Sequence, residues 1–302
     1  MYECIDGFLI GQAQDSKNMT GVTVIICKEG MIAGVDVRGG SPGTRETDLL
    51  NPVNTVDRIH ACVLSGGSAF GLAASTGVMK YLYENAIGFD TGFVKVPIVS
   101  QAVLFDLPVG DEFAFPDEKM GYEACKNAGK TLETGVVGAG TGATVGKIRG
   151  YEYCMKSGIG YSKIRTSHGV EVAAIVAVNA LGDVYEDGHI IAGALNDDKK
   201  TFSGTQNILF NLKEEKKWNG SNTTIGAVMT NAILTKPQMQ KVAQMAHDGY
   251  ARAIRPVHTT LDGDTVFSLS TSKVVSSTDI VGSLGAVAME RAIVNAVKSA
   301  AR

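Results

Sequence analysis

Apolar and polar residues alternate along the first part of the chain, which is the pattern of β-strands that bury one face. The alternation runs through Phe8–Gln12, Thr20–Cys27 and Ala33–Val37, and another strand is expected at His60–Leu64. The three residues Lys28-Glu29-Gly30 separate the second segment from the third and have the composition of a turn. We therefore expect those two segments to form a β-hairpin.

Three later segments are typical of strands buried in a core. Gly169–Asn179 carries valine or alanine at every second position, and Ile225–Met229 is a short apolar run preceded by Asn and Gly residues. Thr265–Ser270 follows a polar loop at Pro256–Asp264. Because turn-forming residues precede the second and third runs, the pattern predicts a strand in each case.

Helical spacing of apolar and small residues is found in four segments, which are Leu72–Glu84, Asp117–Gly129, Pro237–Arg252 and Ile280–Ala300. Thr235 is expected to cap the third helix, with Pro237 in its first turn. His247 on that helix is expected to be a packed or surface histidine. Hairpin-like strands followed by long helices favour an α+β fold over a doubly wound parallel sheet.

One segment has the composition of a linker. The run from Asn196 to Lys217 is polar and mixes both signs of charge, and nothing comparable occurs elsewhere in the chain. It lies between segments that read as parts of one fold. We therefore expect residues 1–302 to form a single domain with an exposed linker inside it.

Composition and charge exclude several classes of protein. The 302 residues are 44% hydrophobic and 20% charged, and the net charge of −3 gives no electrostatic case for nucleic acid. The five cysteines are scattered, which favours free thiols in a cytoplasmic protein over disulfides or a zinc site. No signal peptide is apparent and no apolar run approaches membrane-spanning length, so we expect no membrane partner. We expect neither a metal nor a cofactor.

Glycine accounts for 36 residues and is dense in two segments. Ser65–Gly71 joins a strand to a helix, an arrangement whose unpaired N–H groups can bind an anion or an oxyanion. Gly135–Lys147 invites comparison with a phosphate-binding loop, but Thr141 stands where that motif needs glycine and Ile148 where it needs Ser or Thr. We expect this segment to pack tightly and to present a single lysine, Lys147.

A small hydroxyl residue stands where the polar run meets a core strand. Thr223 follows Asn222 and precedes the apolar run at Ile225–Met229. If the 222–223 peptide bond is broken, Thr223 gains a free α-amine beside its hydroxyl, and that amine can act as the general base of a nucleophilic threonine. An ordinary loop-to-strand turn explains the same residues, because Asn, Gly, Ser and Thr all favour turns.

Six segments, taken together and in order, resemble the L-aminopeptidase/D-esterase (DmpA) family, which includes the β-aminopeptidases and the 6-aminohexanoate-oligomer (nylon oligomer) hydrolase. The segments are Arg38–Asp48, Leu64–Leu72, Gly138–Ala143, Asn222–Gly226, Ala246–Arg252 and His258–Phe267. The resemblance runs over nearly the whole chain. It favours the nucleophile interpretation of Thr223 over the turn.

The resemblance implies a four-layer αββα sandwich similar to the N-terminal-nucleophile hydrolases. It implies self-cleavage between Asn222 and Thr223 into an α chain, 1–222, and a β chain, 223–302. Such pairs are expected to assemble into a homo-oligomer, a tetramer or larger. The expected substrates are small amides that carry a free amine, such as short peptides, amino amides and linear 6-aminohexanoate oligomers.

The family's site residues carry over as follows. Thr223 falls on the nucleophile, Asn179 on the asparagine beside the oxyanion, and Asp262 and Asp264 on the pair that orients the nucleophile. Lys147 matches a lysine of the nylon-oligomer branch. Phe105 stands near the family's active-site tyrosine and cannot donate a hydrogen bond, so contacts there differ. With Phe105, the turn residues Ser65, Gly66, Gly67 and Ser68 are candidates for the substrate pocket.

Three alternatives stay open on the sequence. The chain could be an acyl transferase similar to ornithine acetyltransferase, which also cleaves itself before a threonine. It could be a non-catalytic protein that binds an anion through residues 65–71 and 138–147. It could also belong to the family and remain uncleaved.

Overall fold

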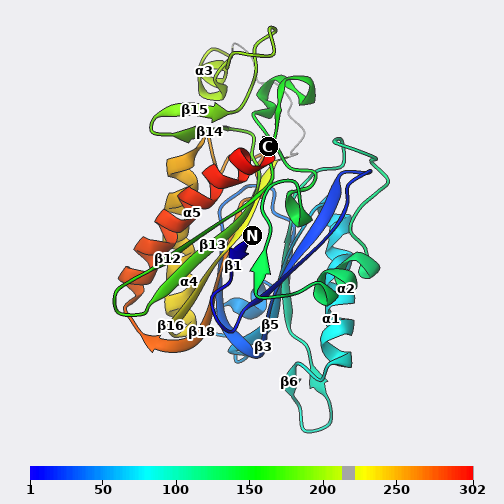
Figure 1. Ribbon diagram of the computed structural model, residues 1–302, viewed down its shortest axis with the longest axis vertical. Helices are drawn as coiled ribbons and strands as arrows, with labels where there is room; N and C mark the ends of the chain where they lie inside the picture. Colours follow the sequence, from blue (N-terminus) through cyan, green and yellow to red (C-terminus); the bar gives the residue numbers. More distant parts are fainter. Residues whose placement is uncertain (213–221, 302) are drawn as a thin grey trace.

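The chain stacks two layers of helices around two layers of strands. The computed structural model describes residues 1–212 and 222–301. Figure 1 shows α4 (Lys236–Ala253) and α5 (Thr278–Ala300) along one side, and α1 (Ala74–Glu84) and α2 (Glu118–Lys126) along the other, with the strands between them. The α+β prediction is confirmed.

Nine strands form the two inner layers, in the order β12-β13-β16-β18-β3-β5-β8-β4, with β2 beside β3. Their bounds are β2 Leu9–Asp15, β3 Thr20–Val37, β4 Thr44–Arg45, β5 Arg58–Ser65, β8 Val99–Val103, β12 Ile159–Arg165, β13 Glu171–Asn179, β16 Thr223–Ile233 and β18 Thr265–Val275. The predicted core strands at 169–179, 225–229 and 265–270 are therefore present, the first beginning at Glu171.

The predicted hairpin at residues 20–37 is wrong, because β3 is one continuous strand of 18 residues. Its first half pairs with β5 through Val22–Ile26, and its second half pairs with β18 through Ile32–Val37. The register with β5 shifts between Ile26 and Met31, so the turn-like residues form a bulge. This strand joins the two sheet layers.

Alternation along the strands supplies three cores, one between each pair of layers. On β13, Val176 packs toward α4 and α5, whereas its neighbour Ile175 packs between the sheets. On β5, Leu64 packs between the sheets, whereas Val63 packs toward α1 and α2. Three cores separate four layers, so the αββα prediction is confirmed.

The helices follow the predicted spacing closely. Asp117 caps α2 by accepting a hydrogen bond from the backbone N–H of Met120. Thr235 is the N-cap of α4, where it forms a capping box with Gln238, and Pro237 lies in the first turn, so both predictions are confirmed. Among the described helices, α5 is long and apolar enough to cross a membrane, contrary to expectation, but 61% of that window is buried in the protein.

Short elements connect this frame. They are β1 Tyr2–Glu3, β6 Phe89–Asp90, β7 Lys95–Val96, β9 Thr131–Leu132, β10 Thr144–Val145, β11 Met155–Lys156, β14 Asp183–Glu186, β15 His189–Ala192, β17 Ile254–Arg255 and α3 Thr205–Phe210. Within the predicted linker, α3 is a helix and Phe202 bridges to Leu195, the residue just before the linker. The rest of that prediction, at 213–217, lies outside the described residues.

Candidate active site

The register between two central strands brings Thr223 to Asn179. Thr223 is the first residue of β16, and it lies opposite Asn179, the last residue of β13. Both are buried, with 5% and 0% of their surface exposed. On the other side of Thr223, the preceding residue Asn222 bridges to Asp262. Residues from three segments distant in sequence therefore meet at one strand end.

The carbonyl group of Asn222 is contacted by two donors. The hydroxyl of Thr223 donates to the carbonyl oxygen, and the backbone N–H of Gly263 donates to the same oxygen at 3.0 Å. A Cβ atom on Gly263 would lie 2.7 Å from the Thr223 Oγ1 atom. Glycine between Asp262 and Asp264 therefore makes room for the hydroxyl.

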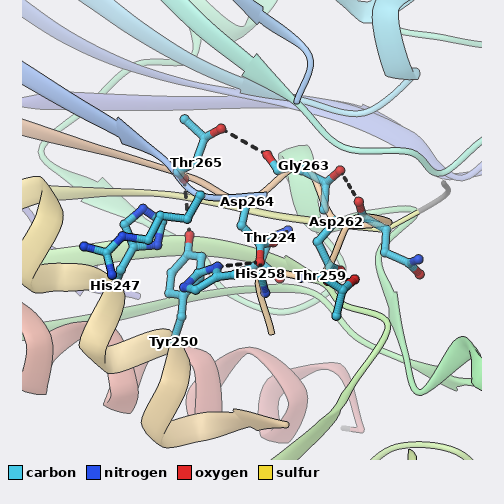
Figure 2. A network of polar contacts seen from close by, with 12 residues as sticks. Thr224, His247, Tyr250, His258, Thr259, Asp262, Gly263, Asp264 and Thr265 are labelled. Atoms are coloured by element: carbon cyan, nitrogen blue, oxygen red, sulfur yellow. Dashed lines mark hydrogen bonds and ion pairs between the residues drawn. The ribbon is translucent and has the colours of Figure 1, made fainter. Parts of the chain in front are cut away.

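The two aspartates are held by different sets of donors (Figure 2). Asp264 accepts from the backbone N–H of Thr224 at 2.7 Å with Oδ1, and its Oδ2 lies 2.9 Å from Nδ1 of His258. Asp262 accepts from the backbone N–H and the hydroxyl of Thr259, at 2.9 Å and 2.5 Å. Burial, helped by the neighbouring charge of Asp264, raises the pKa of Asp262 to about 6.

Lys147 orients the side chain of Asn179. Its Nζ donates to Oδ1 of Asn179 at 2.7 Å and to the Asn179 and Thr144 carbonyls at 2.9 Å and 3.1 Å. With Oδ1 occupied, Nδ2 of Asn179 donates to the carbonyl of Phe105 at 2.9 Å. Burial lowers the pKa of Lys147 to about 7. The glycine-dense segment presents this lysine to the interior, where 4% of its surface is exposed.

Asp106 is a buried carboxylate that sequence reasoning missed. Its Oδ1 accepts from the backbone N–H of Gly67 at 2.6 Å, and its Oδ2 accepts from the hydroxyl of Thr20 at 2.9 Å. Burial raises its pKa to about 6. The signal available in the sequence was an acid inside the apolar run of residues 94–109. An aspartate in a buried segment is rarely left without partners, so its position indicated a structural or functional role.

The turn at residues 65–68 has little free hydrogen-bonding capacity. The backbone N–H groups of Gly66 and Ser68 donate to the carbonyls of Gly21 and Leu104, both at 2.9 Å. Ser65 Oγ donates to the Gly71 carbonyl at 3.2 Å. Together with the Gly67 N–H on Asp106, these bonds leave no anion cradle at 66–68. The turn reaches the site indirectly, through Asp106 and the adjacent Phe105.

Most of the sequence-predicted residues thus gather around one bond, whereas the turn residues Ser65–Ser68 do not. Thr223, Asn179, Lys147 and the backbone of Phe105 form one chain of contacts, and Asp262 and Asp264 approach from the loop before β18. The donors of Asp264, the Gly263 N–H and Asp106 were not anticipated. Among residues 1–212 and 222–301, no cluster of three or more His, Cys, Asp or Glu side chains could hold a metal.

Two sheets between two helical layers, with a buried hydroxyl at the start of a central strand, define the architecture of the N-terminal-nucleophile (Ntn) hydrolases. The chain belongs to peptidase family S58, whose sequence model matches residues 4–302. It is therefore a hydrolase that acts on peptide or amide bonds, and the resemblance drawn from the sequence is confirmed. Family membership favours hydrolysis over the acyl-transfer and anion-binding alternatives.

Relatives and solved structures agree with this assignment. An uncharacterised aminopeptidase of Mycobacterium leprae is 42% identical over 265 residues, which are 84% of this chain and 71% of the relative. The 6-aminohexanoate-oligomer endohydrolase of Kocuria sp. (strain KY2) is 30% identical over 301 residues, 97% of this chain and 81% of the relative.

Two solved structures share the fold. The L-aminopeptidase D-Ala-esterase/amidase of Ochrobactrum anthropi, described as a variant of the Ntn hydrolase fold, superposes with a TM-score of 0.74 at 18% identity. That match covers 98% of this chain and 85% of the other. A Burkholderia sp. β-aminopeptidase gives a TM-score of 0.70 at 18% identity, over 97% and 84% of the two chains.

Proposed function

We propose that this hydrolase cuts its own chain between Asn222 and Thr223 and then hydrolyses amides with Thr223 as the nucleophile. The observation that carries the proposal is the position of the Asn222 carbonyl. It lies against the Thr223 hydroxyl and accepts from the Gly263 N–H, a donor aimed at the oxygen on which charge develops during attack. Both residues are buried at a strand end beside Asn179.

Self-cleavage proceeds by an acyl shift. Oγ1 of Thr223 attacks the Asn222 carbonyl carbon, and the Gly263 N–H stabilises the oxyanion. The C–N bond breaks, the hydroxyl proton passes to the Thr223 nitrogen, and Asn222 is left as an ester on Oγ1. Water hydrolyses that ester, which releases a carboxylate at residue 222 and restores the Thr223 hydroxyl beside the α-amine that the shift has freed.

In turnover the freed amine takes the proton of Oγ1, and Oγ1 attacks the carbonyl of a substrate amide. The leaving amine departs with that proton, and water then hydrolyses the acyl-enzyme. The side-chain amide of Asn179 supplies a donor to the oxyanion, a contribution worth about 10²–10³ in rate. Asp262 and Asp264 attract a substrate ammonium group.

The substrate class is a small amide with a free amine, such as a short peptide, an amino amide or a linear 6-aminohexanoate oligomer. Two buried carboxylates beside Thr223 support this class, because a buried carboxylate favours a neighbouring cation. The names of two relatives, an aminopeptidase and a 6-aminohexanoate-oligomer endohydrolase, agree with it.

The assembly is a homo-oligomer of cleaved pairs, a tetramer or larger, in the cytoplasm. Exposed apolar side chains on the β6–β7 hairpin, where Phe93 is 99% exposed, support a protein contact there. The five cysteines are all free, which supports a reducing compartment.

Thr223→Ala tests the proposal. The variant is expected to remain one unbroken polypeptide by intact mass and to hydrolyse no amide substrate, because it lacks the attacking oxygen. Thr271→Ala is the matched control, since its hydroxyl is buried without a partner among the described residues and lies outside the site. It is expected to be cut like the parent. Two fragments from Thr223→Ala would overturn the proposal.

A further inference from the structure

The backbone ladder between β16 and β18 stops one residue short of Thr224. These parallel strands pair from Ile225 opposite Thr265 onward. The N–H of Thr224 lies just beyond that pairing, and it donates a hydrogen bond to Oδ1 of Asp264 at 2.7 Å. A carboxylate thus extends the ladder to the second residue of the strand.

His258 holds that carboxylate in place (Figure 2). The backbone N–H of His258 donates to Oδ2 of Asp264 at 3.0 Å, and the ring Nδ1 lies 2.9 Å from the same oxygen. Oδ1 is thereby left for Thr224. His258 has φ of +58°, a conformation that a non-glycine residue adopts at some cost.

The ring of His258 is fixed by aromatic neighbours on α4. It packs edge-on against the ring of His247 at 4.6 Å and stacks on Tyr250 at 5.8 Å between centroids. His247 is buried, and its Nε2 lies 3.0 Å from the backbone oxygen of Asp36. Burial lowers the pKa of His247 to about 4, so this neighbour is uncharged near neutral pH.

We propose that His258 is a positioning residue that keeps the new N-terminal end of β16 in register after the chain has been cut. The inference rests on the proposed self-cleavage. Before the cut, Thr223 is held covalently by Asn222, which bridges to Asp262. Afterwards the strand begins with a free end, and free ends fray unless they are tied down. On the β13 side, Thr223 and Thr224 stay opposite Asn179 and Val178. On the β18 side, the hydrogen bond from Thr224 to Asp264 holds this end, and His258 orients Asp264 for it.

The test compares His258→Asn with His258→Asp in the cleaved enzyme. Asn and Asp have the same shape and both tolerate positive φ, but only Asn keeps an N–H donor near the place of Nδ1. His258→Gly fits the backbone and removes the side chain without adding charge. Turnover is measured as kcat and KM, and amide hydrogen exchange is followed by mass spectrometry in the segment that begins at residue 223.

His258→Asp and His258→Gly are expected to lower kcat about tenfold or more, with KM changed far less, because a charge-assisted hydrogen bond is lost. Exchange at the start of β16 is expected to accelerate by a similar factor. His258→Asn is expected to restore both to within about threefold of the parent. In the uncut Thr223→Ala background, the same changes at His258 are expected to leave that exchange nearly unaltered.

Two results would overturn the inference alone. One is a cleaved parent whose Asp and Gly variants match it in kcat and exchange. The other is equal acceleration of exchange in the cut and uncut backgrounds, which would make His258 an ordinary structural residue. A parent that stays one unbroken polypeptide overturns the proposed function itself, and intact mass distinguishes that case before any variant is compared.

Discussion

Gly263→Ala probes the geometry of self-cleavage without removing any reacting group. The new Cβ would lie 2.7 Å from Thr223 Oγ1 and 2.7 Å from the backbone oxygen of Ser41, whereas ordinary contact begins at 3.4 Å. Backbone yields less readily than a side chain, so the hydroxyl of Thr223 is expected to move by about 0.7 Å, the difference between those two distances. The backbone N–H that binds the Asn222 carbonyl is retained.

That displacement sets the expected magnitude. Misplacing a reacting group by about 1 Å costs roughly 10²-fold in rate. At about 1.36 kcal/mol for each factor of ten, this corresponds to about 2.7 kcal/mol of activation free energy. Overpacking a buried site costs about 1–3 kcal/mol of unfolding free energy, so the variant is expected to fold. Self-cleavage should therefore slow by about a hundredfold in a protein that remains native.

The assay follows newly made protein. Cell-free translation with a short radioactive pulse is followed by a chase, and the appearance of two fragments is timed on a denaturing gel. Gly129→Ala is the matched control, because its Cβ would meet nothing within 4 Å and it lies outside the site. It should be cut at the parent rate. A folded Gly263→Ala protein cut as fast as the control would refute the assignment of Thr223 Oγ1 as the attacking atom.

Two further predictions concern pH. The pKa of Lys147 is lowered to about 7 in the folded protein. Between pH 7 and about 10.4, the reference pKa of lysine, the folded chain therefore binds one proton fewer than the unfolded chain. The contribution of Lys147 to stability rises with pH over that range. Chemical denaturation measures the free energy of unfolding of the parent and of Lys147→Met. From pH 7 to 10 the parent's value minus the variant's should increase by up to about 1.4 kcal/mol per pH unit, and a constant difference contradicts this. The raised pKa of Asp106, about 6, has the opposite sign. The parent's advantage over Asp106→Asn should shrink as pH rises from about 4 to 6, and an advantage that grows would show that this carboxyl is stabilised as an anion.

The spacing of apolar residues was sufficient to predict most helices and strands, because the pattern within each segment determines which of its faces is buried. β13, β16, α4 and α5 were predicted from spacing alone and differ from the structure by a few residues at their ends. The strand β3 was mispredicted for a different reason. Lys28-Glu29-Gly30 has turn chemistry, but the strand continues because β5 and β18, distant in sequence, pair with its two halves.

The site shows a similar division between local and distant information. The resemblance pointed to the residues around Thr223, and the register between β13 and β16 places Asn179 opposite it. The partners of those residues were not predictable, because they depend on tertiary contacts. Asp106 accepts a hydrogen bond from Gly67, in a turn from another part of the chain. The Gly263 N–H is a backbone donor, so no side chain marks it in the sequence. His258 belonged to a motif, yet its role emerges only from the position of Asp264.

Two buried polar groups that lack a hydrogen-bond partner lie beside the bond proposed to break, whereas others, such as the Thr271 hydroxyl, lie elsewhere in the described residues. Oδ1 of Asn222 and Oγ1 of Thr224 are buried without a hydrogen-bond partner among the described residues. Each such group costs about 1–3 kcal/mol, and Asp262 beside them is buried with its pKa raised. Selection for stability of the uncut form alone would favour apolar residues here, because they pack without these costs. Under the proposed function, breaking the bond would free Asn222 to leave and open Thr223 to substrate. Unsatisfied groups beside a reacting bond are expected where a functional site breaks a local rule of packing.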